Sequence, residues 1–154
     1  MNKVLLGLSI IVLMAACADN EDGSSNDSQA KVVEIEKKTT DGQWRLIFFS
    51  QDGKEQTSQF NGYLFDFDEG NLITVTNGSE NFPGNWAVST TNRNDHTPDH
   101  QFGDIGFNIS FNTPADFESL TENWEVVSLT DTKLELRHIS NGESGMDVLA
   151  FERI

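Results

Sequence analysis

Basic residues are scarce in this chain of 154 residues, which has 10 Lys and Arg against 25 Asp and Glu and a formal charge of −15. Nucleic acid is excluded as a partner, because binding its phosphate backbone requires a basic surface. A single cysteine excludes an internal disulfide framework and a CxxC metal site. The chain also lacks Gly-x-Ser-x-Gly, His-Glu-x-x-His and glycine-rich phosphate-binding motifs. The length suits one domain and a short extra segment, and the missing motifs favour a protein that is not an enzyme and needs no cofactor.

The most apolar stretch, residues 4–13, is too short to span a bilayer, which needs about 20 residues. It follows Lys3 and precedes Ala15 and Ala16, an order typical of a secretory signal. Residues 18–30 contain four acids, no base and no apolar side chain larger than Ala. Such a segment cannot bury enough surface to offset its ordering entropy, so we expect disorder through about residue 30.

Residues 13–17, Leu-Met-Ala-Ala-Cys, resemble the lipobox of bacterial lipoproteins. The resemblance implies cleavage before Cys17, whose thiol would carry diacylglycerol and acyl chains such as palmitate. Several acyl chains, at about 0.8 kcal/mol for each buried CH₂, would anchor the protein stably in a membrane. The alternative is an ordinary secretory cleavage without lipid. Cys17 is therefore the expected lipid-attachment residue.

The residues after Cys17 indicate where such an anchor would lie. By resemblance to Gram-negative lipoproteins, Ala18 favours the outer membrane, and the acids Asp19, Glu21 and Asp22 resemble a signal for cell-surface exposure. A solvated linker is the alternative interpretation of those acids. Loss of the leader removes Lys3 and leaves nine bases against 25 acids, a charge of −16. We expect a signal peptide at 1–16, a lipidated, acidic, flexible tether at 17–40 and a folded domain at 41–154.

From residue 41 the apolar pattern has a period of two, which predicts strands. Trp44, Leu46 and Phe48 alternate with their neighbours, and similar alternation recurs to the end of the chain. We count eight strands, which begin near residues 44, 63, 72, 86, 105, 124, 134 and 148. Short connections between most of them predict antiparallel pairing. The fold class is therefore all-β, and an eight-stranded up-and-down barrel or a sandwich would fit.

Three connections are longer. Residues 50–61 and 91–103 are expected to be polar loops. Residues 113–120 predict one short helix, capped by Thr113 with Pro114 at its first position, and Phe117 and Leu120 form its apolar face. Residues 31–38 fit either an edge strand or a short helix that leads into the domain.

The string Gly42-Gln43-Trp44 resembles the Gly-x-Trp motif that opens the first strand of lipocalins and related calycin barrels. That resemblance covers about residues 41–154, and it favours the barrel over the sandwich. It also implies that an Arg from the end of the barrel packs over the Trp ring. Arg153, on one face with Leu149 and Phe151, is the first candidate for this role, and Arg137 is the second.

The aromatic residues supply the candidate ligand site, because a barrel of eight strands can hold one small ligand or be filled by its own side chains. The residues expected to point inward are Trp44, Tyr63, Phe65, Phe67, Phe107 and Phe111. Our first hypothesis is a membrane-tethered lipocalin-like protein that binds a small apolar or amphipathic ligand. The second is a lipoprotein with a filled barrel that contacts another envelope protein, through the loop aromatics Phe60, Phe82 and Phe102, whose alternative role is to plug the ends of the barrel.

Two strings have some metal-ligating character. Residues 95–100, Asp-His-Thr-Pro-Asp-His, contain His and carboxylate ligands, but Pro98 prevents a helix from aligning them. Residues 66–71, Asp-Phe-Asp-Glu-Gly-Asn, lack the final Glu of a calcium loop and fit a hairpin turn. We expect no metal site in either.

Overall fold

Eight antiparallel strands close into a barrel in the computed structural model, which describes residues 23–91, 102, 105–139 and 145–154. Each barrel strand pairs with the next along the chain, and the last strand returns to pair with the first. The predicted all-β, up-and-down barrel is therefore confirmed. The barrel strands are β1 (Gln43–Gln51), β3 (Leu64–Phe67), β4 (Leu72–Thr76), β5 (Asn81–Thr90), β6 (Ile105–Phe111), β7 (Glu122–Leu129), β8 (Lys133–Ile139) and β9 (Met146–Arg153).

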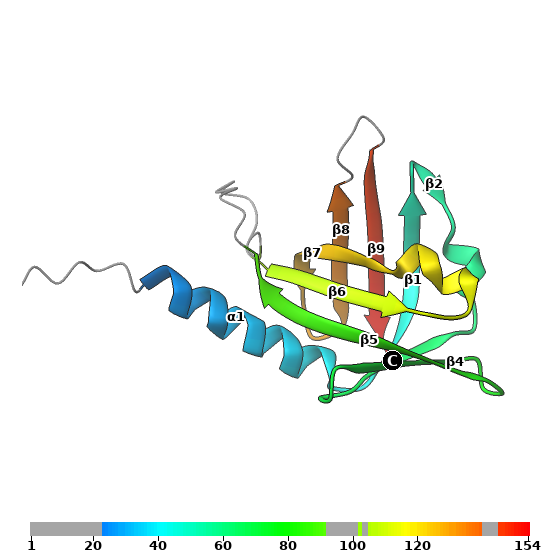
Figure 1. Cartoon of the computed structure of the whole chain (residues 1–154), viewed down its shortest axis with the longest axis horizontal. Coiled ribbons are helices and arrows are strands. Elements are labelled where there is room, and N and C mark those ends of the chain that lie inside the picture. Colours follow the sequence, from blue (N-terminus) through cyan, green and yellow to red (C-terminus); the bar gives the residue numbers. More distant parts are fainter. Residues whose placement is uncertain (1–22, 92–101, 103–104, 140–144) are drawn as a thin grey trace, which may run out of the picture.

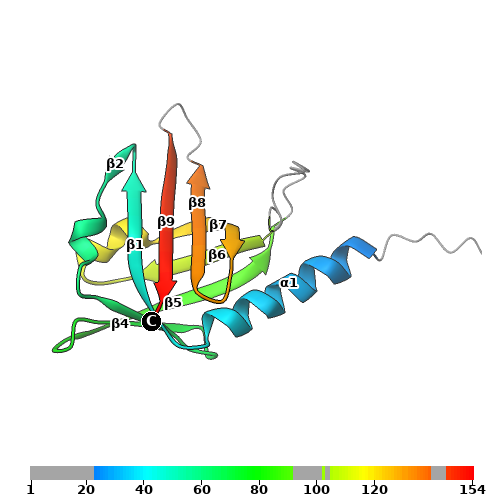
Figure 2. The ribbon, with the colours of Figure 1, turned by 180° about the vertical axis from the view of Figure 1, so that it is seen from behind.

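Four further elements accompany the barrel: helix α1 (Gly23–Thr39), the two-residue strand β2 (Lys54–Glu55), and the 3-10 helices η1 (Thr57–Phe60) and η2 (Ala115–Leu120). Figure 1 shows α1 running away from one side of the barrel, while the two 3-10 helices lie on the opposite side. The view from behind shows the same separation and brings β1, β9 and β8 to the front (Figure 2). We call the end beside α1 the helix end and the end beside η1 and η2 the plug end.

The two-residue period of the sequence places alternate side chains inside the barrel, with one interruption in β1. Trp44 and Leu46 are buried as expected, but the ladder with β9 shifts register between Leu46 and Phe48. This β-bulge turns Phe49 inward, where it has no exposed surface, and leaves Phe48 outside at 38% exposure. The expectation that Phe48 shares the inner face with Trp44 is wrong, because a strict alternation cannot anticipate a bulge.

The largest difference from the sequence expectation is α1, which occupies most of the segment expected to be a flexible tether. Val32, Ile35 and Thr39 are buried, at spacings of three and four residues, which places them on one side of a helix. The ambiguous segment 31–38 is therefore helical rather than an edge strand. The helix has little hydrophobic character of its own, and it is stabilised by packing against the barrel.

Of the two connections at the plug end, the 50–61 connection is more ordered than predicted. The 50–61 loop contains the β2 hairpin and η1, and Phe60 at its end is buried.

The short helix predicted at 113–120 is present as η2, but it begins at Ala115 after Pro114, and no side chain caps it. The prediction that Thr113 caps this helix is therefore wrong. The Thr113–Pro114 peptide bond is cis. Nearly all of the expected 91–103 loop lies outside the described residues.

Candidate functional site

The barrel interior contains the aromatic residues that were expected to face a ligand. Trp44, Phe65 and Phe107 have no exposed surface, Phe67 has 1% and Phe111 has 6%. Tyr63 is only half-buried and lies just before β3, at the plug end. A side chain without accessible surface borders neither solvent nor a void large enough for a water molecule. At these positions the interior is therefore closely packed.

Aromatic rings contact one another across the middle of the barrel. Phe67 lies 5.8 Å from Phe107 and 5.9 Å from Phe151 between ring centroids, with interplanar angles of 80° and 89°. Phe151 also meets Phe65 edge to face at 5.1 Å. These are the distances and angles that aromatic pairs prefer, and each adds about 0.5–1.5 kcal/mol beyond area burial. The rings thus fill the space that an apolar ligand would need.

At the plug end, Phe117 of η2 lies at the centre of an aromatic cluster. Its ring centroid is 5.9 Å from that of Phe60 and 5.3 Å from those of Tyr63 and Phe82. Phe111 is 5.1 Å away on the other side. Phe60 and Phe117 are 2% and 1% exposed. We call these five residues the aromatic plug, because they close the end of the barrel beneath η1 and η2.

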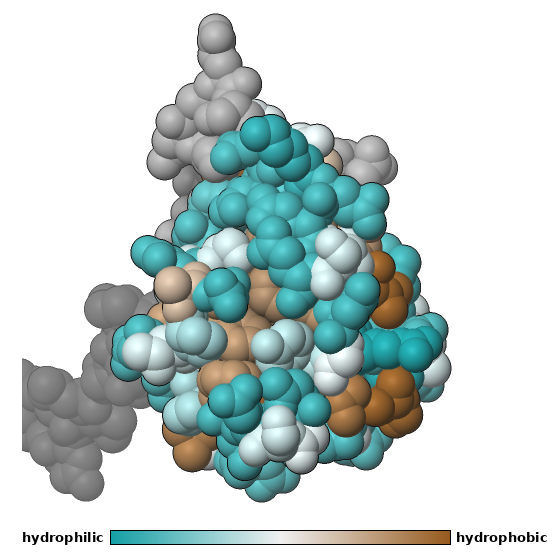
Figure 3. Space-filling view, turned by 90° about the vertical axis from the view of Figure 1, so that its right-hand side faces the viewer, coloured by the Kyte–Doolittle hydropathy of each residue, from teal (hydrophilic) through white to brown (hydrophobic). Residues whose placement is uncertain are grey.

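Two threonine hydroxyls hold the short helices against the strands. Thr57, the first residue of η1, accepts a hydrogen bond from the Phe49 amide at 3.0 Å. Thr121, directly after η2, accepts one from the Phe111 amide at 2.9 Å. The pairing of β1 with β3 has ended before Phe49, and that of β6 with β7 before Phe111, so each hydroxyl satisfies a backbone amide that would otherwise lack a partner on that side of its strand. The face that carries the short helices is mostly hydrophilic, with hydrophobic groups between the polar ones (Figure 3).

At the helix end, Trp44 and Arg153 form the contact that the lipocalin resemblance implies. The Arg153 guanidinium lies 5.0 Å from the centre of the Trp44 ring. Gly42 adopts a positive φ of 97°, and a Cβ there would lie 3.5 Å from the Arg153 side chain. Glycine is thus favoured by the backbone conformation, whereas the distance to Arg153 alone would allow a larger side chain. Arg137 pairs instead with Glu125 at 2.9 Å.

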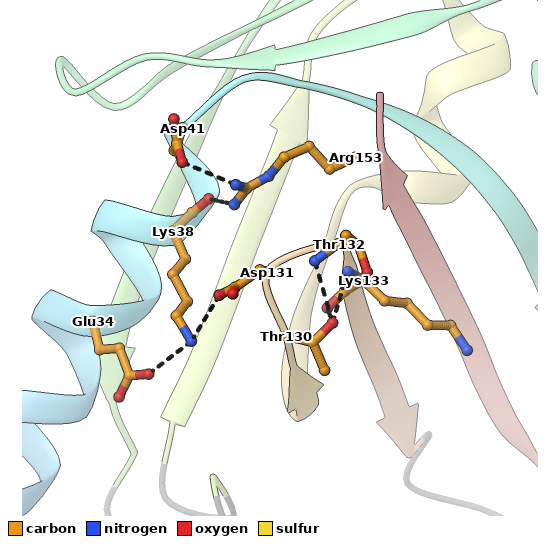
Figure 4. A network of polar contacts seen from close by, with 8 residues as sticks. All are labelled: Glu34, Lys38, Asp41, Thr130, Asp131, Thr132, Lys133 and Arg153. Carbon is orange, nitrogen blue, oxygen red and sulfur yellow. Dashed lines mark hydrogen bonds and ion pairs between the residues drawn. The ribbon is translucent and has the colours of Figure 1, made fainter.

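Polar contacts continue from this pair into α1 (Figure 4). The Trp44 indole donates to the Thr39 carbonyl at 2.8 Å. Arg153 donates to the Lys38 carbonyl at 2.5 Å and to the Asp41 carboxylate at 2.9 Å. The Lys38 ammonium lies 3.1 Å from Glu34 and 3.5 Å from Asp131. Its hydrogen bond to Glu34, with Asp131 adding to the effect, raises the pKa of Lys38 above its ordinary value.

Three pockets of about 320, 490 and 590 Å³ open on the outside of the barrel, around the C-terminal end of α1. Thr40 and Glu69 line all three of them. Most of their other lining residues are charged or polar, such as Lys37 and Asp66. Val33 and Trp86 give the first pocket an apolar part, but the residues that line the other two are mostly polar or charged, unlike the concave apolar surface that a lipophilic ligand requires.

Metal ligands do not gather in the part of the chain that the structure describes, where no group of three His, Cys, Asp or Glu side chains is placed to hold an ion. The string at 95–100 lies outside the described residues. Residues 66–71 form the expected turn, in which the Asp68 amide donates to the Leu72 carbonyl at 2.8 Å. His138 lies at the barrel wall, with its Nδ1 3.2 Å from the Asn123 carbonyl.

Several residues that fix the plug end carry no sequence signal of their own. Thr57 and Thr121 lie in polar segments, and each accepts a single hydrogen bond from a strand amide eight or ten residues earlier, which no periodic pattern marks. Gly84 in β5 faces Phe111, whose ring occupies the place where a Cβ would lie, at 2.5 Å. Of the two roles considered for the loop aromatics, contact with a partner or closure of the barrel ends, Phe60 and Phe102 fit the second, because they are buried at 2% and 3% exposure. Only Phe82 remains partly exposed.

The closed antiparallel barrel is compatible with a lipocalin-like fold and with ligand binding. No family model, curated protein or solved structure matches the chain. Among the described residues, no helix has the length and apolar character needed to cross a membrane. The class that the fold defines is therefore an eight-stranded barrel with aromatic side chains inside it.

Proposed function

We propose that this protein is a lipid-anchored outer-membrane protein whose barrel is filled by its own side chains, and which acts without catalysis by contacting another envelope protein. One observation supports this function over ligand carriage. Trp44, Phe65 and Phe107, which would line a ligand site, have no accessible surface. A lipocalin-like carrier needs an apolar cavity open at one end, whereas here the aromatic plug covers that end.

The anchor rests on the leader and on Cys17. The thiol follows the apolar run and two alanines directly, as lipidation requires. After Cys17, the chain needs only five further residues to reach Gly23, where α1 begins. The barrel would then be held close to the membrane by a short acidic link and a helix. Surface exposure of the domain follows from the acidic residues of this link, by the resemblance stated above.

Ligand carriage remains the second candidate, because two residues of the aromatic plug, Phe60 and Phe117, lie on short 3-10 helices. Each helix is held by few hydrogen bonds, and helices of four and six residues have little stability of their own. If η2 moved outward, it would carry Phe117 out of the barrel end and open a space beneath the helix. In that case the ligand would be apolar, because the residues exposed by that movement are aromatic.

A lipophilic fluorescent probe distinguishes the two candidates. A filled barrel gives no saturable binding and no quenching of tryptophan emission by the probe. A carrier binds one probe for each chain and quenches tryptophan emission as the probe enters. Native mass spectrometry of protein purified from its own host provides the second measurement. A filled barrel shows the mass of the acylated chain alone, whereas a retained small molecule would contradict the filled-barrel proposal.

Anchoring is tested separately with radiolabelled fatty acid. The natural chain should incorporate the label and fractionate with the outer membrane, and Cys17→Ser should abolish both. Ser9→Ala, which changes a polar residue of the leader without touching the thiol, is the matched control and should retain the label. Labelling of the Cys17→Ser protein would show that the assignment of the anchor is wrong.

A further inference from the structure

The outer surface of β1, β9 and β8 carries a strip of exposed apolar side chains, which we call the β8–β9–β1 face. Phe48 is 38% exposed, Met146 51% and Ile139 48%. The strand register places Phe48 opposite Ala150, and Ile139 opposite Met146, with Val148 two residues from each of these β9 positions. Phe48, Val148, Met146 and Ile139 therefore lie along a diagonal that crosses three adjacent strands, with Val148 half-buried at its centre and Ala150 buried at 4% exposure.

The charges beside this strip cancel. Arg45 pairs with Glu152, Lys133 with Glu135 at 2.5 Å, and Arg137 with Glu125 at 2.9 Å. The other side of the barrel is different, because residues 55–91 and 105–132 contain no Lys or Arg at all. The β8–β9–β1 face is thus both apolar and electrically balanced on a molecule that is otherwise strongly anionic.

We propose that this face binds a second copy of the same chain, in a two-fold symmetric dimer. In register terms, Val148 lies midway between Phe48 on β1 and Ile139 on β8. A two-fold axis through Val148 therefore places Phe48 of one copy against Ile139 of the other, and the reverse. Such an isologous contact pairs a large aromatic residue with an aliphatic one twice.

Charge favours a second copy over other occupants of the face. A basic partner would be attracted to the strands without Lys or Arg, rather than to this one. Binding to an anionic membrane requires Lys or Arg that is available to the lipid headgroups, and the three such residues here are already in ion pairs. Two copies that each carry about −16 repel one another at their acidic surfaces, so a balanced apolar face is where they can approach. This inference is independent of whether the barrel holds a ligand.

Cysteine crosslinking in the full-length chain, expressed in a bacterial envelope, tests the geometry. Val148→Cys lies on the proposed axis and should give a band of twice the mass on mild oxidation. Leu72→Cys on β4 is the control, since Leu72 is 52% exposed, more than the half-buried Val148, but lies away from the strip, so that accessibility alone would favour crosslinking of Leu72→Cys. The unchanged chain, whose only cysteine is Cys17, gives the background. Equal crosslinking of Val148→Cys and Leu72→Cys would overturn the proposal.

The two-fold axis makes a stricter prediction. Phe48→Cys and Ile139→Cys, each with its own tag and expressed together, should form a mixed disulfide. Either protein expressed alone should crosslink poorly, because like residues lie on opposite sides of the axis. Crosslinking of each with itself, but not of the pair, would exclude this arrangement.

Phe48→Glu tests the apolar contact, since it should lower the crosslinked fraction of Val148→Cys about tenfold or more. Leu72→Glu should leave that fraction unchanged, and circular dichroism verifies that both variants keep the β spectrum. Raising the salt concentration should increase the crosslinked fraction, because it screens the repulsion between the two anionic copies. A decrease with salt would indicate a contact made by ion pairs and would contradict the proposal.

Discussion

The two ends of the barrel are closed by different kinds of interaction. At the helix end, the ring of Trp44 and the guanidinium of Arg153 connect to α1 through directed hydrogen bonds and one cation–π contact. At the plug end, Phe60 and Phe117 meet through rings that need only the right volume. Directed contacts depend on the chemical identity of each partner, whereas apolar packing depends on how completely the space is filled. Substitutions should therefore affect the two ends in different ways.

The largest effect is expected at the helix end, from Trp44→Ala. This change leaves a large void and also removes the hydrogen bond to Thr39 and the surface under Arg153, so it should lower the free energy of unfolding by about 5 kcal/mol. Trp44→Phe keeps most of the volume and should cost about 1–2 kcal/mol. Urea denaturation followed by circular dichroism measures both. Equal losses of stability in Trp44→Ala and Trp44→Phe would mean that the hydrogen bond of the indole nitrogen, rather than packing, contributes most of the stability at this end.

Phe117→Ala at the plug end should cost less, about 3 kcal/mol, because η2 is short and can settle partly into the space. It should also admit a lipophilic probe that the natural chain excludes. Phe48→Ala, at a half-exposed ring outside the barrel, is the control and should cost less than about 1 kcal/mol. Stability is measured by urea denaturation, and probe entry by tryptophan quenching. A Phe117→Ala chain that still excludes the probe would show that this residue does not plug the barrel.

Arg153→Lys separates charge from geometry at the helix end. The substitution keeps the positive charge but loses the planar group that lies over Trp44 and reaches both Lys38 and Asp41, so a loss of about 1–2 kcal/mol is expected. Arg45→Lys provides the matched control, because its exposed pair with Glu152 should change stability by no more than about 0.5 kcal/mol. Thermal and urea unfolding of both variants give the comparison. Similar losses would mean that the charge alone matters.

The smallest effect is a pH dependence confined to the helix end. The pKa of Lys38 is raised by its hydrogen bond to Glu34, with Asp131 adding to the effect. The resulting stabilisation is fully present below the unfolded pKa of about 10.5, and it is lost as the pH rises through the higher folded value. The free energies of unfolding of the natural chain and of Lys38→Gln should become equal as the pH rises above the folded-state pKa of Lys38. A constant difference between them would exclude this pair as the source.

Much of the barrel could be predicted from the sequence, because strand alternation and short connections act locally. The inward positions of Trp44, Phe65 and Phe107 could be predicted from the alternation of apolar and polar residues alone. The bulge at Phe48 did not, because it depends on how β1 fits β9. Val32 and Ile35 are spaced as on one face of a helix, and this spacing is visible in the sequence. The polar segment that precedes them made the helix hard to predict. Their burial depends on a barrel surface that the helix alone does not specify.

The ends of the barrel were predicted less well, because their contacts join residues that are far apart in the chain. Gly42 and Trp44 could be identified by resemblance, and with them Arg153 as the partner of the ring. The threonine hydroxyls at Thr57 and Thr121 could not, since one hydrogen bond leaves no pattern in the sequence. The choice between a filled barrel and a ligand site also required the structure, because aromatic residues fit both.

A crystal structure of the protein under xenon pressure tests most directly whether the barrel is filled. Xenon enters dry apolar cavities in proteins, so its position reports space that water does not occupy. The packed interior predicts no xenon and no unexplained electron density among Phe65, Phe67 and Phe107. A xenon atom or an elongated ligand density bounded by those three rings would contradict the filled barrel and restore the carrier hypothesis.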